Sequence, residues 1–256
     1  LVRKLYILII NMKVKILKVK DKTDKFVKKK KKTFDMPLRL LIVGKSGMGK
    51  SSIIFNLLAN ENPEFYSKDF PEPENIFIFS NSLKGDAKIQ TLIKHLDIPK
   101  ENLFGGYSED SVEVVYDMLV DNFNDAVADK EKPQHSLLIF DDVSFDGSLK
   151  GREKANQMNR IFMNGRKFLI STIATAQKYT DLGTGLRENA TGLILGKSSN
   201  KQIEAIEADH NYLKERKMFR DMFLEHTKDK HDFLVINFSK KELYFDKDFE
   251  PVHMEC

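Results

Sequence analysis

Five short apolar runs alternate along the chain with segments whose apolar residues recur every three or four positions. The runs lie at 38–43, 75–79, 136–140, 168–176 and 191–195. Continuous apolar runs of this length are typical of strands that are buried on both faces of a parallel sheet. The helical spacing lies in 51–60, 86–96, 110–128, 152–163 and 202–220. This alternation predicts an α/β fold with a mainly parallel central sheet and helices on both faces.

The last part of the chain has a different pattern. Residues 232–237 and 242–245 are two short strand-like runs with a polar connection between them, which predicts a C-terminal β-hairpin. Residues 62–74 contain three prolines and predict a loop. The expected architecture is therefore a three-layer sandwich that is completed by this hairpin.

Charge divides the chain into two regions. Residues 1–35 carry 13 basic and three acidic side chains, whereas the whole chain has a net charge of +4. We therefore expect a basic N-terminal arm at 1–35 and one domain at 36–256. The five lysines Lys28–Lys32 are typical of a solvated, disordered segment or of a segment that contacts nucleic acid. Two alternatives remain: a short edge strand within 13–20, or upstream sequence outside the native protein, because Met36 directly precedes the first predicted strand.

Several classes of protein are excluded by composition. The single cysteine, Cys256, excludes a disulfide framework and a cysteine-rich zinc site. The early apolar run Leu5–Ile10 is far shorter than the ~20 residues of a membrane span. We expect neither a membrane span nor a cleaved signal peptide, since no small-residue cleavage site precedes the lysines. The six histidines are scattered without metal-ligand spacing.

A phosphate-binding loop follows the first predicted strand. Gly44–Ser51 reads G-K-S-G-M-G-K-S, which matches G-x-x-x-x-G-K-[ST] between a strand and a helix. The glycines allow the backbone to wrap a phosphate, and the loop amides and helix N-terminus direct positive dipole toward it. Lys50 would reach the β- and γ-phosphates, and the Ser51 hydroxyl would ligate Mg²⁺. The expected nucleotide contacts are Gly44, Lys45, Ser46, Gly47, Met48, Gly49, Lys50, Ser51 and Ser52.

Two further sets of polar residues follow buried strands. The strand at 136–140 leads directly into Asp141 and Asp142. Ligands bind at this edge of an open parallel sheet, so we expect Asp141 to hold Mg²⁺ and Asp142 to orient or deprotonate a water. Gln177 ends the next strand and is expected to contact the γ-phosphate or the attacking water. A helix cap for the aspartates and a loop-facing glutamine are the structural alternatives.

In this order these motifs resemble the FtsK–HerA superfamily of P-loop motor ATPases. Within it they are most similar to the genome-packaging ATPases of double-stranded DNA viruses, namely the poxvirus type and its relatives in giant viruses and virophages. The resemblance rests on Gly44–Ser51, Leu137–Asp142, the strand that ends at Ala176–Tyr179, and Leu186–Asn189. It covers roughly residues 38–200. Asp142 is a departure, because the family often has Glu there.

The resemblance implies a function and several partners. It implies an ATP-driven motor that uses Mg²⁺, translocates double-stranded DNA into a capsid, and forms a homo-oligomeric ring of five or six subunits. Capsid or portal proteins are the implied partners, and the host cytoplasm, viral factory or virion is the implied location. It also implies an arginine finger, for which Arg187 is the first candidate and Arg166 the second.

Three points remain open in the sequence. Lys150, Arg152, Lys154, Arg160, Arg166 and Lys167 form a basic excess that is expected to face DNA phosphates or solvent. A GTPase-like switch is an alternative function, although no Asn-Lys-x-Asp motif is present. The other alternative is a non-catalytic nucleotide-binding assembly protein, against which the intact Lys50, Asp141, Asp142 and Gln177 argue.

Overall fold

The structure, a computed structural model, describes residues 23–142 and 156–253. Its centre is an eight-stranded sheet in the order β3-β2-β4-β5-β1-β6-β7-β8. The strands are β1 (Arg39–Val43), β2 (Ile76–Ser80), β3 (Leu103–Phe104), β4 (Ser136–Asp141), β5 (Ile170–Ala176), β6 (Gly192–Gly196), β7 (Phe233–Asn237) and β8 (Tyr244–Phe245). The six strands β1 to β6 are parallel to one another, and β7 and β8 are added to one edge of the sheet in antiparallel pairings. The mainly parallel sheet and the C-terminal hairpin are therefore confirmed.

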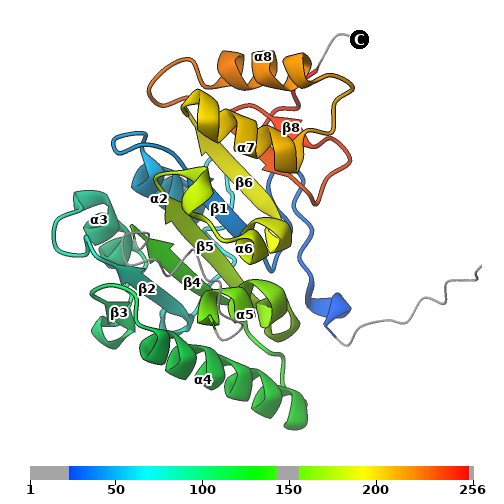
Figure 1. Ribbon diagram of the computed structural model, residues 1–256. Helices are drawn as coiled ribbons and strands as arrows, with labels where there is room; N and C mark the ends of the chain where they lie inside the picture. Colours follow the sequence, from blue (N-terminus) through cyan, green and yellow to red (C-terminus); the bar gives the residue numbers. More distant parts are fainter. Residues whose placement is uncertain (1–22, 143–155, 254–256) are drawn as a thin grey trace, which may run out of the picture.

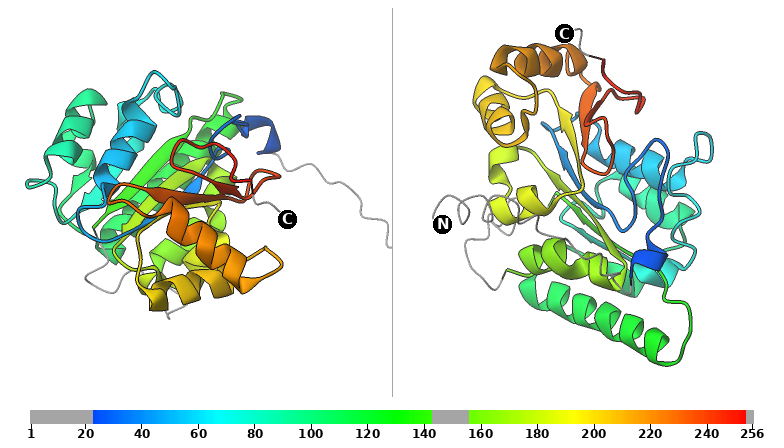
Figure 2. Two further views of the ribbon diagram at one scale, coloured as in Figure 1. Left: turned by 90° about the horizontal axis from the view of Figure 1, so that it is seen from above. Right: turned by 90° about the vertical axis from the view of Figure 1, so that its right-hand side faces the viewer.

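Helices cover both faces of this sheet (Figures 1 and 2). One face carries α2 (Lys50–Ala59) and α3 (Ala87–His95). The other carries α4 (Glu109–Ala128), α5 (Gln157–Asn164), α6 (Thr184–Asn189), α7 (Asn200–His210) and α8 (Arg216–His226). Short 3-10 helices lie at Asp24–Phe26, Pro73–Asn75, Lys100–Asn102, Gly165–Phe168 and Tyr179–Asp181.

The apolar strands form two cores. Side chains alternate across a strand, so Leu41 and Val43 pack with α4 to α8, whereas Leu40 and Ile42 pack with α2 and α3. Both faces of β1 are thus buried. A central strand with two buried faces fixes the position of the loop that follows it, which begins at Gly44.

The prediction of one long helix over 202–220 is wrong. The chain forms α7 and α8 instead, with a break at 211–215. At the break the Asn211 side chain accepts a hydrogen bond from the Leu213 N–H at 2.8 Å. The Tyr244 hydroxyl donates to the His210 carbonyl at 2.7 Å and accepts from the Tyr212 N–H at 2.9 Å. A tyrosine of the hairpin therefore satisfies backbone groups that a continuous helix would have paired internally.

The basic segment before β1 packs onto the domain from about residue 28. Phe34 and Met36 are fully buried. The Phe34 ring occupies the place of a side chain at Gly192, where an added Cβ would lie 2.1 Å from it. Lys28 pairs with Asp69 at 3.1 Å, and Lys29 pairs with Asp35 at 2.7 Å. Residues 28–36 therefore pack against the domain, and residues 1–22 lie outside the described part of the chain.

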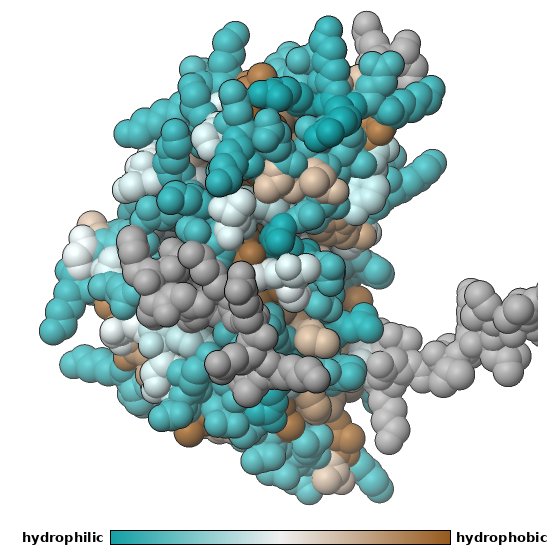
Figure 3. Space-filling view, viewed as in Figure 1, coloured by the Kyte–Doolittle hydropathy of each residue, from teal (hydrophilic) through white to brown (hydrophobic). Residues whose placement is uncertain are grey.

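The face shown in Figure 3 is mainly hydrophilic, with apolar residues scattered over it. The large apolar side chains that are exposed include Val114 and Met118 on α4. Within 23–142 and 156–253, no helix combines the length and the apolar character that a membrane span requires.

Candidate nucleotide-binding site

The loop after β1 has the backbone that its glycines predict. Gly47 has φ +79° and Gly49 has φ +105°, which are conformations that residues with a Cβ rarely adopt. Gly49 directly precedes α2, so the loop ends at a helix N-terminus. The Lys50 Nζ donates a hydrogen bond to the Gly44 carbonyl oxygen at 2.9 Å. Ser51 and Ser52 follow in the first turn of α2.

Side chains from distant segments hold this loop from outside. The Met48 side chain lies against both Gly44 and Gly196, where an added Cβ would come within 2.3 Å and 2.7 Å of it. The His231 Nδ1 donates to the Met48 carbonyl oxygen at 2.9 Å. The loop is therefore packed between the end of β6 and the connection from α8 to β7. The sequence motif gave no indication of the contact from His231.

The two aspartates lie at the end of β4, as expected, but in different environments. Asp141 is buried, and its Oδ1 accepts a hydrogen bond from the Thr175 hydroxyl at 2.9 Å. The same hydroxyl accepts from the Asp142 N–H at 3.0 Å. Asp142 has φ +55° and receives a hydrogen bond from the Gln177 Nε2 at 3.4 Å. Thr175 of β5 thus fixes one carboxylate, and Gln177 reaches the other.

These groups share one cavity of about 570 Å³. It is lined by Ser46, Gly47, Gly49, Lys50, Ser51, Ser82, Gly85, Asp86, Ala87, Lys88, Asp141, Asp142 and Gln177. The structure therefore brings together the loop lysine, both aspartates and the glutamine, which come from three strand ends.

A third carboxylate, which the sequence motifs did not indicate, also lines this cavity. Asp86 caps α3 and accepts hydrogen bonds from the backbone N–H groups of Lys88 and Ile89. It also accepts a hydrogen bond from the Ser51 hydroxyl at 2.7 Å. Burial works against its charge, but the hydrogen bonds from Ser51, Lys88 and Ile89 hold the pKa of Asp86 below its ordinary value. Asp86 is therefore an ionised carboxylate beside Ser51.

The electrostatics of the cavity suit a cation. Burial raises the pKa of Asp141, and the charges of Asp86 and Asp142 raise it further. Burial lowers the pKa of Lys50, although the same aspartates Asp141 and Asp142 oppose this shift. A buried carboxylate among other carboxylates is stabilised when a divalent cation binds, and Ser51 and Asp141 supply the oxygen donors that Mg²⁺ prefers. The described residues contain no cluster of three or more His, Cys, Asp or Glu that could hold a metal by itself. Such a cation would therefore complete its shell with water and phosphate oxygens.

A second cavity, of about 410 Å³, adjoins the first. Lys45, Lys178, Lys197 and Lys201 line it, together with Ser46 and Gln177 of the first cavity. Asp181 is the only acidic side chain among the described residues that line it. Ser46 of the phosphate loop and Gln177 therefore line both the first cavity and the basic one.

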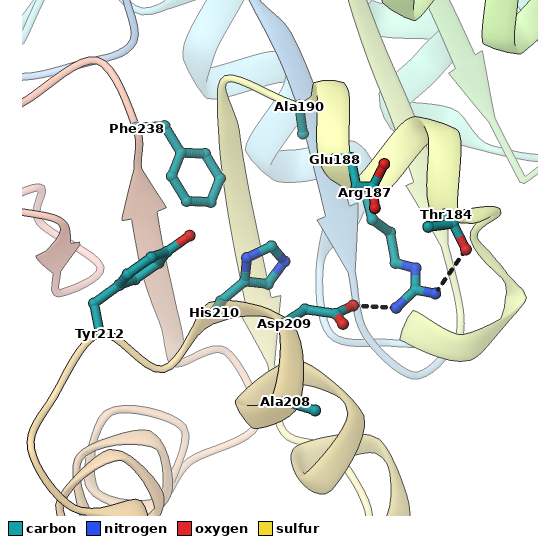
Figure 4. A pocket seen from close by; sticks show the side chains of 9 residues that line it. All are labelled: Thr184, Arg187, Glu188, Ala190, Ala208, Asp209, His210, Tyr212 and Phe238. Atoms are coloured by element: carbon teal, nitrogen blue, oxygen red, sulfur yellow. Dashed lines mark hydrogen bonds and ion pairs between the residues drawn. The ribbon is translucent and has the colours of Figure 1, made fainter. Parts of the chain in front are cut away.

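Arg187 lines a separate cavity of about 520 Å³ (Figure 4), and no residue of Gly44–Ser51 is among the residues that line it. It forms an ion pair with Asp209, and its guanidinium lies 5.0 Å from the centre of the Tyr179 ring. The Tyr179 hydroxyl contacts Asp209 and His210, each at 2.7 Å. Burial lowers the pKa of His210 to about 4, so this histidine is neutral at pH 7. Among the described residues that line this cavity, Arg187 is therefore the only cation.

The other basic candidates lie elsewhere. Arg166 is close to Arg39, whose pKa is lowered to about 10 by burial and by the Arg166 charge. Arg39 begins β1, so Arg166 lies at the sheet edge opposite the phosphate loop. Arg160 pairs with Asp117 at 2.9 Å. Lys150, Arg152 and Lys154 lie outside the described residues.

Comparison with known proteins identifies the family of the chain. The family model described as Poxvirus A32 protein matches residues 72–249. The chain belongs to the poxvirus A32 protein family. The matched part of this A32 family member includes Asp86, Asp141, Asp142, Gln177 and Arg187, whereas the phosphate loop lies upstream of it. No curated protein matches the chain in sequence.

Solved structures similar to this A32 family member share its fold. The genome packaging NTPase B204 from Sulfolobus turreted icosahedral virus 2, solved with AMPPCP, is 13% identical, with a TM-score of 0.54 over 85% of this chain and 100% of that chain. B204 described as the DNA-packaging ATPase from Sulfolobus turreted icosahedral virus is 16% identical, with a TM-score of 0.55 over 85% and 99%. EssC (ATPases 2 and 3) from Geobacillus thermodenitrificans is 16% identical, with a TM-score of 0.53 over 81% and 38%. The resemblance to viral packaging ATPases that the motifs indicated is confirmed.

Proposed function

We propose that this protein is an ATP-driven motor that translocates double-stranded DNA and packages a viral genome into its capsid. The observation that supports this most is the cavity in which the phosphate loop faces Asp141, Asp142 and Gln177. Membership of the A32 family and a fold shared with B204, which is described as a DNA-packaging ATPase, also support this proposal.

The loop residues Gly44–Ser52 bind the nucleotide phosphates in this proposal. Lys50 now donates to the Gly44 carbonyl, so its ammonium lies within the loop and can turn to the β- and γ-phosphates. Ser51 and Asp141 would hold Mg²⁺, which when bound would neutralise negative charge on the phosphates. Lys45, Ser46 and Met48 complete the contact by shaping the loop.

Hydrolysis is assigned to the residues beside the γ-phosphate position. Asp142 is the less buried of the two aspartates and takes the role of orienting and deprotonating the attacking water. Gln177, 3.4 Å from Asp142, holds the same water from its amide group. Arg187 does not line this cavity, so it acts on a neighbouring subunit if it is the arginine finger. Arg166 remains the second candidate.

Removing the charge of Asp141 and removing that of Asp142 are expected to have different effects on nucleotide binding and hydrolysis. Asp141→Asn should weaken Mg²⁺-dependent nucleotide binding, because Mg²⁺ prefers charged oxygen ligands. Asp142→Asn should bind nucleotide almost normally but hydrolyse it about 10²–10⁴-fold more slowly, since a general base contributes that much. Binding of a non-hydrolysable ATP analogue and single-turnover hydrolysis separate the two effects. An equal loss of binding in both variants would assign Asp142 to the metal.

The proposed function is tested by ATP hydrolysis with and without duplex DNA. We expect DNA of any sequence to raise turnover, and the apparent DNA affinity to fall with salt at a log–log slope of roughly −0.9 per phosphate neutralised. A Lys197→Ala/Lys201→Ala protein tests whether the basic cavity is the DNA contact, with Lys100→Ala/Lys132→Ala as the control for lost charge. A preference for GTP would favour the switch, and nucleotide binding without turnover would favour an assembly protein.

The proposal also assigns partners and a place. The active form is a ring of five or six copies, because an arginine finger supplied by a neighbour needs a closed series of interfaces. Its further partners are capsid or portal proteins, and it works in the host cytoplasm or viral factory and remains associated with the virion. The mass of the assembled protein measures the size of the ring directly.

A further inference from the structure

Asp86 has a contact that its role as a helix cap does not require. Its Oδ1 accepts hydrogen bonds from the N–H groups of Lys88 at 2.8 Å and Ile89 at 3.2 Å, which is a complete N-cap for α3. Its Oδ2 accepts a hydrogen bond from the Ser51 hydroxyl at 2.7 Å. Ser51 is 35 residues away on α2. Oδ1 therefore caps α3, whereas Oδ2 accepts a hydrogen bond from Ser51, the residue that follows Lys50.

This contact determines where the Ser51 lone pairs point. A hydroxyl has one proton and two acceptor lone pairs. Because the proton is donated to Asp86, the lone pairs face away from that carboxylate, and they are the part of a hydroxyl that can bind a cation. Asp86 also lines the same cavity as Asp141 and Asp142.

We propose that Asp86 is a positioning residue for the magnesium ion of this site and acts through the Ser51 hydroxyl. Asp86 fixes the orientation of the hydroxyl through its Oδ2, without belonging to the sequence motifs of the site. Its two N-cap hydrogen bonds attach the carboxylate to the first turn of α3 and so hold the other oxygen toward Ser51. This inference rests on the proposed function, because it presumes that nucleotide and Mg²⁺ bind at this cavity.

Two substitutions separate positioning from helix capping. Asp86→Asn retains a capping side chain of the same size but removes the charge. Asp86→Ser retains a good cap but is too short to reach Ser51. Asp110→Asn makes the same chemical change on the exposed first turn of α4 and serves as the control. Thermal unfolding of each variant verifies that α3 is still formed.

The measured quantity is the Mg²⁺ concentration that half-saturates binding of a fluorescent, non-hydrolysable ATP analogue to the full chain. We expect Asp86→Asn and Asp86→Ser to raise it about 10-fold or more, which is the usual effect of removing a residue that orients a metal ligand. Binding of the analogue in EDTA should stay within twofold of wild type, and Asp110→Asn should have no effect. A half-saturation that is unchanged in both Asp86 variants would overturn the inference.

A double-mutant cycle tests the route through Ser51. In a Ser51→Ala background, Asp86→Asn should have little further effect, because the hydroxyl that it orients is gone. A full, additive effect in that background would overturn the action through Ser51. Wild-type protein that binds no analogue at any Mg²⁺ concentration would refute the proposed function itself. A wild type that binds normally, with unaltered Asp86 variants, would refute the positioning role alone.

Discussion

Lys50→Ala is expected to abolish ATP hydrolysis while leaving the protein folded. The lysine ammonium is directed into the loop, where its Nζ now donates to the Gly44 carbonyl. Without it, the loop loses the lysine that lines the cavity and would meet the charge that develops on the β- and γ-phosphate oxygens. Loss of one group that stabilises charge in a transition state costs about 10²–10³ in rate. Steady-state hydrolysis at saturating ATP measures the loss.

Lys94→Ala is the matched control for this prediction. It removes the same charge from the exposed last turn of α3, where no residue lines the phosphate-loop cavity. Its turnover should equal that of wild type, and both variants should unfold at the wild-type temperature. Hydrolysis by Lys50→Ala at a near wild-type rate would show that the cavity is not the site of the reaction.

Arg187→Ala is expected to reduce turnover about 10³–10⁵-fold with nucleotide binding retained, the range known for arginine fingers. Arg187 lies in a cavity of its own and pairs with Asp209, so it contributes nothing to the phosphate loop of its own chain. As an arginine finger it would have to leave Asp209 and enter the site of a neighbouring subunit. Only assembled protein should therefore be active.

Mixing experiments distinguish action on a neighbour from a structural role. A Lys50→Ala subunit has a defective site but retains its finger, whereas an Arg187→Ala subunit has an intact site but no finger. Mixed rings contain some interfaces where an intact site faces an intact finger, so activity should return at intermediate ratios. If co-assembly is verified by mass and no ratio restores activity, Arg187 is not a finger. Arg166→Ala is then tested in the same way.

The buried strands were predictable because each is a short apolar run with both faces covered. Strands β1, β2, β4 and β6 lie within one residue of the expected ranges, and β5 begins two residues late. The two-residue strand β3 and the six-residue helix α6 are too short to show a period. The break between α7 and α8 escaped prediction because it depends on Tyr244, which is more than 30 residues downstream.

The candidate site was predictable to the extent that its residues follow strands or form a contiguous motif. Lys50, Asp141, Asp142 and Gln177 stand at strand ends or in the loop, and the parallel sheet necessarily brings such positions to one edge. Asp86 is separated from β2 by a turn, and within the sequence it looks like any helix cap. Its significance lies in a hydrogen bond to a second helix, which no local pattern records.

The packing of Met48 couples the position of the phosphate loop to the end of β6. Its side chain fills the space between two glycines, one in the loop and one at the end of β6, and its carbonyl is held by His231. Protein interiors are close-packed and transmit strain, so the loop cannot shift as nucleotide is bound or released without displacing the β6–α7 corner. Lys197, which follows that strand end, lines the basic cavity. A shift of the phosphate loop would therefore also move the strand end that precedes this lysine of the basic cavity.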